Sequence, residues 1–195
     1  MTRERDRLYI GASGVSAGIL GRSEENQRDS VFAYNPAVAE KDAVSLTMPV
    51  RLKSYTWAYG VHPLFEMHLP EGHLKAELVR RFSKSVRGFD DFALLSIVGP
   101  HQLGRISVTH TTANESLPEV KLSDVLVYDG AKDLFDDLMN TYAAYSGVSG
   151  VQPKVLVRDI GDTDSDVARL THRGATHLVK AFNDSDFAQL AANEF

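Results

Sequence analysis

The chain of 195 residues contains no cysteine. Disulfide frameworks and thiolate metal sites are therefore excluded, and a reducing cytosol is the setting that this composition permits. No apolar run approaches the length of a membrane-spanning helix, and the charged N-terminal stretch MTRERDRLYI lacks the apolar core of a signal peptide. We therefore expect a cytoplasmic protein with no part in a membrane.

Positive charge is also scarce. The chain carries 21 lysine and arginine residues against 26 aspartate and glutamate residues, which gives a formal net charge of −5. This balance argues against direct binding of nucleic acid by the chain. The hydrophobic fraction of 43% is ordinary for a folded protein, and the length suffices for one large domain or two small ones.

The first 110 residues have the patterns of a small antiparallel sheet with helices. Apolar and polar residues alternate where strands are expected, and apolar residues recur with helical spacing elsewhere. The expected strands cover residues 7–14, 15–22, 30–36, 45–52 and 104–110. The expected helices cover residues 62–83, with a break at LPEG (69–72), and residues 89–99. The aromatic residues Tyr55, Trp57 and Tyr59 alternate, as on one face of a strand or an extended loop. They belong either to the core, which is favoured, or to a partner-binding patch.

The remaining residues begin with a polar stretch at 111–120 that has the composition of a linker. A helix over 130–145 would align its apolar residues on one stripe, and strands are expected at 154–158 and 176–182. A last helix opens near Asp184 and ends in FAQLAANEF without a stop signal. We therefore interpret the chain as a fragment of a longer protein.

The stretch YSGVSGVQPKVLVRD, residues 145–159, places two glycines and a serine just ahead of a lysine and a strand. The order helix, glycine loop, strand is wrong for a Walker phosphate loop, and Val155 stands where that motif needs serine or threonine. Two interpretations of the loop stay open. It is either a helix cap followed by a turn, or a flexible loop that covers nucleotide phosphates, as in protein kinases.

Two charged residues favour the nucleotide interpretation. Lys180 lies in the apolar strand HLVKAF, where an ammonium group needs an anion unless the strand is at an edge and the side chain reaches solvent. Glu194 falls at helical spacing from Phe187 and Leu190, on the inward face of the last helix unless the helix end is frayed. A strand lysine held by a helix glutamate is the arrangement that aims a kinase lysine at phosphates.

The sequence resembles the HipA family of bacterial toxin serine/threonine kinases. Four stretches carry the resemblance, and they occur in the same order as in the family. They are LFEMHLPEG (64–72), FDDFALLSIVGPHQLGRISV (89–108), GVSGVQPKVLV (147–157), and THLVKAF with LAANEF (176–195). The resemblance implies an α+β fold. A cap subdomain, a small antiparallel sheet with helices, would cover residues 1–110. A connecting helix and the start of a kinase-like N-lobe would cover residues 111–195, with the C-lobe absent.

The resemblance also implies the site and its cofactors, ATP and Mg²⁺. The implied ATP-binding residues are Val148, Ser149, Gly150, Val151, Gln152, Lys154 and Lys180, with Glu194 as the ion-pair partner of Lys180. The catalytic and metal-binding aspartates would lie in the C-lobe, so the fragment itself is expected to be inactive, with no metal site of its own. The family often has an autophosphorylated serine at the place of Gly147. Phosphorylation there is impossible in this chain, and Ser149 is the remaining candidate.

The implied partners are a helix-turn-helix antitoxin of the HipB type and a protein substrate. In the family that substrate is in known cases an aminoacyl-tRNA synthetase, whose phosphorylation arrests growth. An alternative function stays open, in which the chain is a stand-alone, non-catalytic module that binds a kinase or an antitoxin. His62, His68 and His73 do not share one helical face, so we interpret them as surface residues rather than metal ligands.

Overall fold

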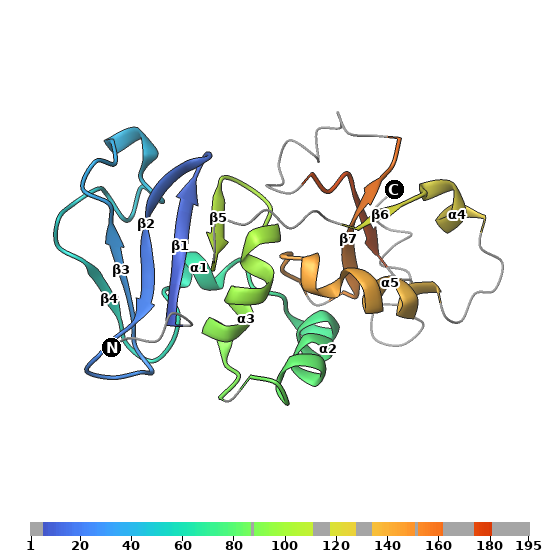
Figure 1. The fold of residues 1–195 in the computed structure, drawn as a ribbon, viewed down its shortest axis with the longest axis horizontal. Helices are drawn as coiled ribbons and strands as arrows, with labels where there is room; N and C mark the ends of the chain where they lie inside the picture. Colours follow the sequence, from blue (N-terminus) through green and yellow to red (C-terminus); the bar gives the residue numbers. More distant parts are fainter. Residues whose placement is uncertain are drawn as a thin grey trace.

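The computed structural model describes residues 6–86, 88–110, 118–127, 134–150, 152–161 and 174–180. It contains two β-sheets, one of five strands and one of three. Figure 1 shows the larger sheet at one end of the molecule and the smaller sheet at the other, with helices between them. Among the helices of these residues, none has the length and apolar composition needed to cross a bilayer.

The larger sheet is antiparallel throughout, with strand order β4-β3-β2-β1-β5. Its strands are β1 (Arg7–Ala12), β2 (Val15–Arg22), β3 (Ser30–Tyr34), β4 (Tyr55–Trp57) and β5 (Ile106–Thr109). The predicted hairpin of residues 7–22 is confirmed. Ser13 and Gly14 turn the chain with φ angles of 52° and 81°, the positive values that a two-residue hairpin loop requires.

Three helices belong to the same unit, which we call the first unit (residues 6–110). They are α1 (Pro63–Glu66), α2 (Gly72–Phe82) and α3 (Asp91–Val98), and a 3₁₀ turn, η3 (Gly99–His101), follows α3. The predicted break between two helices is confirmed. Asp90 caps the start of helix α3, and its carboxylate accepts a hydrogen bond from the Ala93 N–H at 3.0 Å. Its apolar residues Leu94, Leu95 and Val98 are fully buried in the core.

Three expectations for the first unit are wrong. Residues 45–52 do not form a strand, because Ser45 and Met48 close a tight turn that places only Met48 in the core. Trp57 and Tyr59 are 42% and 81% exposed rather than buried, because β4 is an edge strand and Tyr59 lies in the bend that follows it. The histidines of this region are not all surface residues. His62 is half-buried and caps α1 by accepting a hydrogen bond from the Leu64 N–H.

The second unit (residues 118–180) is built around the smaller sheet, with order β6-β7-β8. Its elements are β6 (Glu119–Val120), α4 (Leu122–Leu126), α5 (Leu134–Tyr142), the 3₁₀ turn η4 (Ala143–Tyr145), β7 (Lys154–Asp159) and β8 (His177–Lys180). The predicted helix and both predicted strands are present. The linker interpretation is wrong for Glu119 and Val120, which pair in parallel with the end of β7. The helix expected near Asp184 lies outside the described residues.

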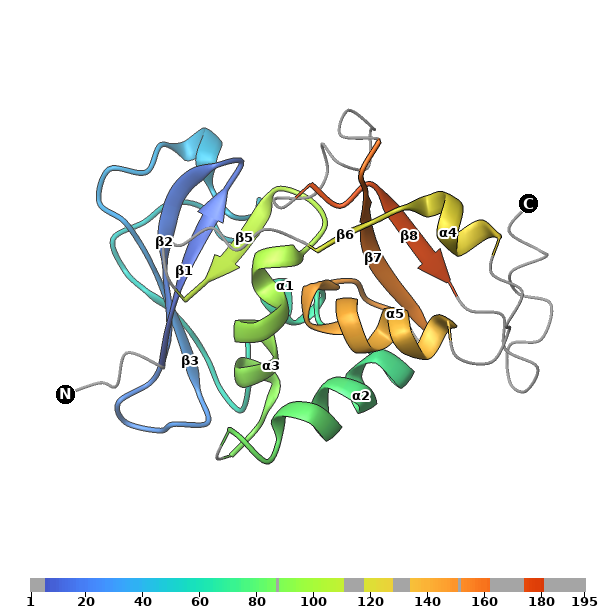
Figure 2. The same cartoon turned by 45° about the vertical axis from the view of Figure 1, so that its right-hand side comes forward.

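Helices α2 and α5 join the two units through side-chain hydrogen bonds. Figure 2 shows α2 and α5 as neighbours. Arg81 of α2 donates to the backbone carbonyl of Asn140 at 2.6 Å and to its side-chain oxygen at 2.5 Å. Glu77, one turn earlier, accepts hydrogen bonds from Arg80 and Arg81 and so fixes the guanidinium that reaches α5.

This arrangement makes the stability of the fold depend on the charge of Glu77. The hydrogen bond from Arg80, together with the one from Arg81, lowers the pKa of Glu77 to about 2 from its ordinary value of 4.5. The carboxylate therefore stabilises the fold above about pH 4.5, and the contribution is lost as the pH falls toward 2. We expect Glu77→Gln to lower the free energy of unfolding by about 1 kcal/mol at neutral pH.

Urea unfolding at neutral and at acidic pH measures this effect. The difference between wild type and Glu77→Gln should shrink as the pH falls, because the wild-type carboxylate becomes protonated and the glutamine does not titrate. Glu66→Gln is the matched control, since Glu66 is exposed on α1. A difference that stays constant with pH would show that Glu77 acts through packing and not through charge.

Candidate functional site: two lysines beneath a glycine loop

The loop that leads from η4 into β7 starts at a buried serine. Ser146 is fully buried, and its hydroxyl donates to the Tyr142 carbonyl at 2.7 Å. The same oxygen accepts a hydrogen bond from the Leu156 N–H at 2.8 Å. Ser146 thereby ties the end of α5 to the middle of β7, so the loop begins and ends on fixed elements.

Gly147 rests directly on the backbone of the first unit. It forms an isolated parallel bridge with Gln102, the residue after η3. A Cβ atom at position 147 would lie 2.7 Å from the Val98 carbonyl oxygen and 2.9 Å from the backbone N and Cα of Gln102. Backbone atoms cannot move aside as a flexible side chain can, so only glycine fits here.

The tip of the loop is more open. Val148 is buried, whereas Ser149 is exposed and leaves its hydroxyl accessible. Gly150 has a φ of 107°, in the region that favours glycine. Gln152 is buried again where the chain enters β7, and Val151 lies outside the described residues. The loop therefore has a fixed base and a tip of small residues.

Lys154 is the first residue of β7, and its side chain lies against this tip. Its ammonium Nζ donates a hydrogen bond to the Ser149 carbonyl at 3.1 Å. A Cβ atom on Gly150 would collide with the same Nζ atom. Glycine at position 150 thus allows the ammonium of Lys154 to sit directly beneath the loop.

Lys180 is the cross-strand partner of Lys154. The register of the antiparallel pair β7–β8 places the two residues opposite each other, and both are half-buried. Directly opposite residues share a face of the sheet, and two like charges in that relation repel each other. The two opposed ammonium groups concentrate positive charge on this face, so the geometry suits a phosphate group.

A third cation on this face was not recognised from the sequence. Arg158 is four residues after Lys154 on β7, and residues separated by an even number lie on the same face of a strand. Its Nε atom is 3.8 Å from Glu119 Oε1, the limit of an ion pair. The strand predicted at 154–158 already contains Arg158, and strand alternation would have placed it on the face of Lys154.

The structure thus brings Ser149, Gly150, Lys154 and Lys180 into one neighbourhood. Glu194, the predicted partner of Lys180, lies outside the described residues, so that ion pair stays a prediction. The described part of the chain holds no group of three histidine, cysteine or carboxylate side chains arranged for a metal ion.

Comparisons with known proteins agree with this architecture. Residues 8–109 match the family model described as the HipA N-terminal domain. No curated protein matches the chain. The chain is similar to a solved structure from Shewanella oneidensis MR-1, the complex of the toxin–antitoxin system HipA and HipB with its operator DNA. The TM-score is 0.51 and the identity 19%, and the match covers 92% of this chain and 41% of that chain.

At that identity the likeness establishes the fold alone, and the α+β class expected from the sequence is confirmed. The chain spans less than half of the length of the HipA chain that it matches.

Proposed function

Because the chain belongs to the HipA N-terminal domain family, we propose that it is the N-terminal part of a HipA-like serine/threonine protein kinase toxin. The observation that carries this proposal is the position of Lys154 opposite Lys180, beneath a loop that has glycine at its tip. Two ammonium groups on one face of a sheet provide the positive charge that a triphosphate requires.

The proposed cofactors are ATP and Mg²⁺. Phosphoryl transfer depends on positioning and on neutralising charge, and both tasks suit the residues of this loop. Lys180 contacts the phosphates, and Lys154 adds a second charge while holding the loop through Ser149. Gly150 lets backbone N–H groups approach phosphate oxygens closely. Glu194 orients Lys180.

Ser149 is the proposed site of autophosphorylation. Its side chain is exposed, and its own carbonyl accepts the hydrogen bond from Lys154. A phosphate on this hydroxyl would add about two negative charges close to the Lys154 ammonium. Such a phosphate would compete with ATP for the same cation.

The proposed setting is a toxin–antitoxin system in the cytoplasm. The similar Shewanella structure contains HipB and operator DNA, which supports a HipB-like partner that contacts the DNA. The net charge of −5 supports an arrangement in which this chain does not bind nucleic acid itself. The proposed target is an aminoacyl-tRNA synthetase, whose phosphorylation would arrest growth.

One observation favours a second function. The family match is confined to residues 8–109 and does not include the glycine loop. A stand-alone, non-catalytic module that binds a kinase or an antitoxin would need only this part of the chain. The two functions differ in whether the loop and β8 respond to nucleotide.

Nuclear magnetic resonance of the 195-residue chain tests the proposal. Mg²⁺-ATP should perturb the amide resonances of residues 148–150 and 177–180, and AMP should do so more weakly because it carries fewer charges. Lys154→Met and Lys180→Met should each weaken the ATP effect about tenfold, as the loss of one charged hydrogen bond implies. The control Lys84→Met removes an exposed lysine of the first unit.

ATP-induced changes that spare the loop, or that survive both substitutions, would contradict the nucleotide site. The second function predicts no response to ATP. It predicts instead that amide resonances of the first unit shift when an antitoxin or a kinase is added.

A further inference from the structure

The first unit contains a cavity of about 330 Å³ that the proposed nucleotide site does not use. It opens between the β2–β3 connection, the residues after β4 and the start of α3. The lining includes Arg28, Asp29, Ser30, Tyr59 and Phe92. Its volume is in the range of pockets that bind small molecules.

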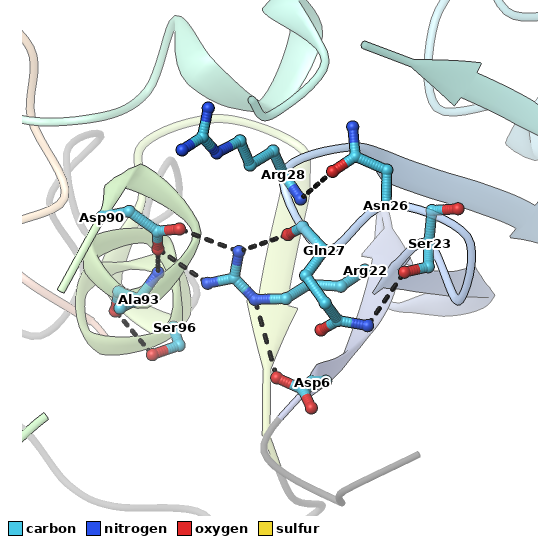
Figure 3. A network of polar contacts seen from close by, with 9 residues as sticks. All are labelled: Asp6, Arg22, Ser23, Asn26, Gln27, Arg28, Asp90, Ala93 and Ser96. Carbon is cyan, nitrogen blue, oxygen red and sulfur yellow. Dashed lines mark hydrogen bonds and ion pairs between the residues drawn. The ribbon is translucent and has the colours of Figure 1, made fainter. Parts of the chain in front are cut away.

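One wall of the cavity is a rigid ion pair. Arg22 of β2 donates to both carboxylate oxygens of Asp90 at 2.8 and 2.7 Å, and it lies 3.6 Å from Asp6 (Figure 3). Its guanidinium carbon also lies 4.5 Å from the centre of the Phe92 ring. Burial opposes ionisation of Asp90, but the hydrogen bonds from Arg22 and the Ala93 N–H outweigh it and keep the pKa of Asp90 below its ordinary value. Arg22 and Asp90 already have each other as hydrogen-bond partners, so they support the wall of the cavity and are not available to a ligand.

Ser30 supplies the first sign of a ligand. Its side chain is 2% exposed, and its hydroxyl has no hydrogen-bond partner among the described residues. A buried hydroxyl without a hydrogen-bond partner destabilises the fold. Such a hydroxyl in a cavity wall indicates that a bound ligand supplies the missing hydrogen bond. Ser30 itself lines the cavity.

Two opposite charges in the lining do not neutralise each other. Arg28 is exposed, and its side chain extends from the β2–β3 connection toward the end of α3 that carries Asp90 (Figure 3). Its guanidinium forms no hydrogen bond or ion pair with a described residue. Asp29 accepts hydrogen bonds from the Tyr59 N–H and from Asn26 at one carboxylate oxygen, Oδ1. Its other oxygen, Oδ2, accepts no hydrogen bond from a described residue. A ligand that carries both signs of charge would satisfy both residues.

Tyr59 supplies an aromatic surface at the rim. Its φ of 60° is unusual for a residue other than glycine, and the hydrogen bond to Asp29 holds it there. Its side chain is 81% exposed. The strained backbone of Tyr59 therefore places an aromatic ring beside the cavity. A planar or apolar group of a ligand can pack against this ring.

We propose that this cavity binds a small zwitterion, an α-amino acid with an aromatic side chain. Its carboxylate binds the guanidinium of Arg28 and the hydroxyl of Ser30. Its ammonium group binds the free carboxylate oxygen of Asp29, and its ring packs against Tyr59. This site lies entirely in the first unit, so the proposal does not depend on the nucleotide site.

Titration of the 195-residue chain with phenylalanine and two derivatives tests the charge requirement. Phenylalanine amide keeps the ammonium but lacks the carboxylate, and N-acetylphenylalanine keeps the carboxylate but lacks the ammonium. We expect phenylalanine to shift the amide resonances of residues 28–30 and 59–61. Each derivative should bind at least about tenfold more weakly, the cost of one lost charged hydrogen bond.

Two variants assign the charges. Arg28→Gln should weaken phenylalanine and N-acetylphenylalanine about tenfold and leave phenylalanine amide unchanged. Asp29→Asn should weaken phenylalanine and its amide instead, while its remaining oxygen still accepts from the Tyr59 N–H. Lys84→Gln serves as the control. Equal binding of all three compounds overturns the proposal, as does the absence of any shift with each standard amino acid at about 10 mM, where even a millimolar Kd is detected.

Discussion

Lys180→Met should lower the rate of phosphotransfer roughly 10²- to 10³-fold in the complete protein of which these residues form the proposed N-terminal part. Methionine keeps the length and apolar stem of lysine and removes only the charge. In this chemistry the charge on the transferred group is spread over phosphate oxygens, and each fixed cation lowers the barrier directly. Transfer of label from γ-labelled ATP to protein measures the rate.

Lys154→Met should cost less, about tenfold, because that residue acts partly on the loop through its hydrogen bond to Ser149. Lys84→Met should retain the wild-type rate. Thermal unfolding of each variant separates lost activity from lost structure. Phosphotransfer by Lys180→Met at a rate close to wild type would remove Lys180 from the phosphate site, and the kinase proposal would fail with it.

Local patterns predicted the elements of this chain well where each element is bounded by its own sequence. The hairpin of residues 7–22 is specified by the alternation of β1 and by a turn at Ser13 and Gly14. The break between α1 and α2 follows from a proline and a glycine that disfavour a continuous helix. In these places local preference and tertiary packing act in the same direction.

The errors arise where a distant partner decides the structure. Glu119 and Val120 have the composition of a linker, and they become a strand only because Arg158 and Asp159 offer a free edge. Residues 45–52 alternate like a strand, yet no strand of the described residues pairs with them, and the chain turns at Ser45 instead. Sequence preference for strands is weak against such effects.

The candidate sites also depend on residues that are distant in the sequence. Lys154 and Lys180 were both recognised from the sequence, but their direct opposition depends on the register of β7 and β8, which no local signal fixes. The cavity of the first unit was not foreseen at all. Arg28, Tyr59 and Phe92 come from three separate segments, and each is unremarkable in its own surroundings. Only the folded arrangement makes them neighbours.

Gly147→Ala should lower the free energy of unfolding by about 1 to 3 kcal/mol, the range typical when atoms are forced into a tightly packed site. The added methyl group would meet the Val98 carbonyl and the backbone of Gln102, neither of which can rotate away. Relief requires the second unit to separate from η3 at this point. The position of the glycine loop therefore depends on contact with the first unit as well as on its own residues.

Gly161→Ala is the matched control, because a Cβ atom there meets only the Asp159 carboxylate at 3.7 Å, an ordinary contact distance. Urea unfolding of both variants measures the difference in stability. Amide resonances should shift in Gly147→Ala around residues 98–102 and 146–150 and remain in place around β1 and β2. Equal stability of the two variants would mean that the backbone at the bridge between Gln102 and Gly147 can shift at little cost. The first unit would then have no part in holding the loop above Lys154.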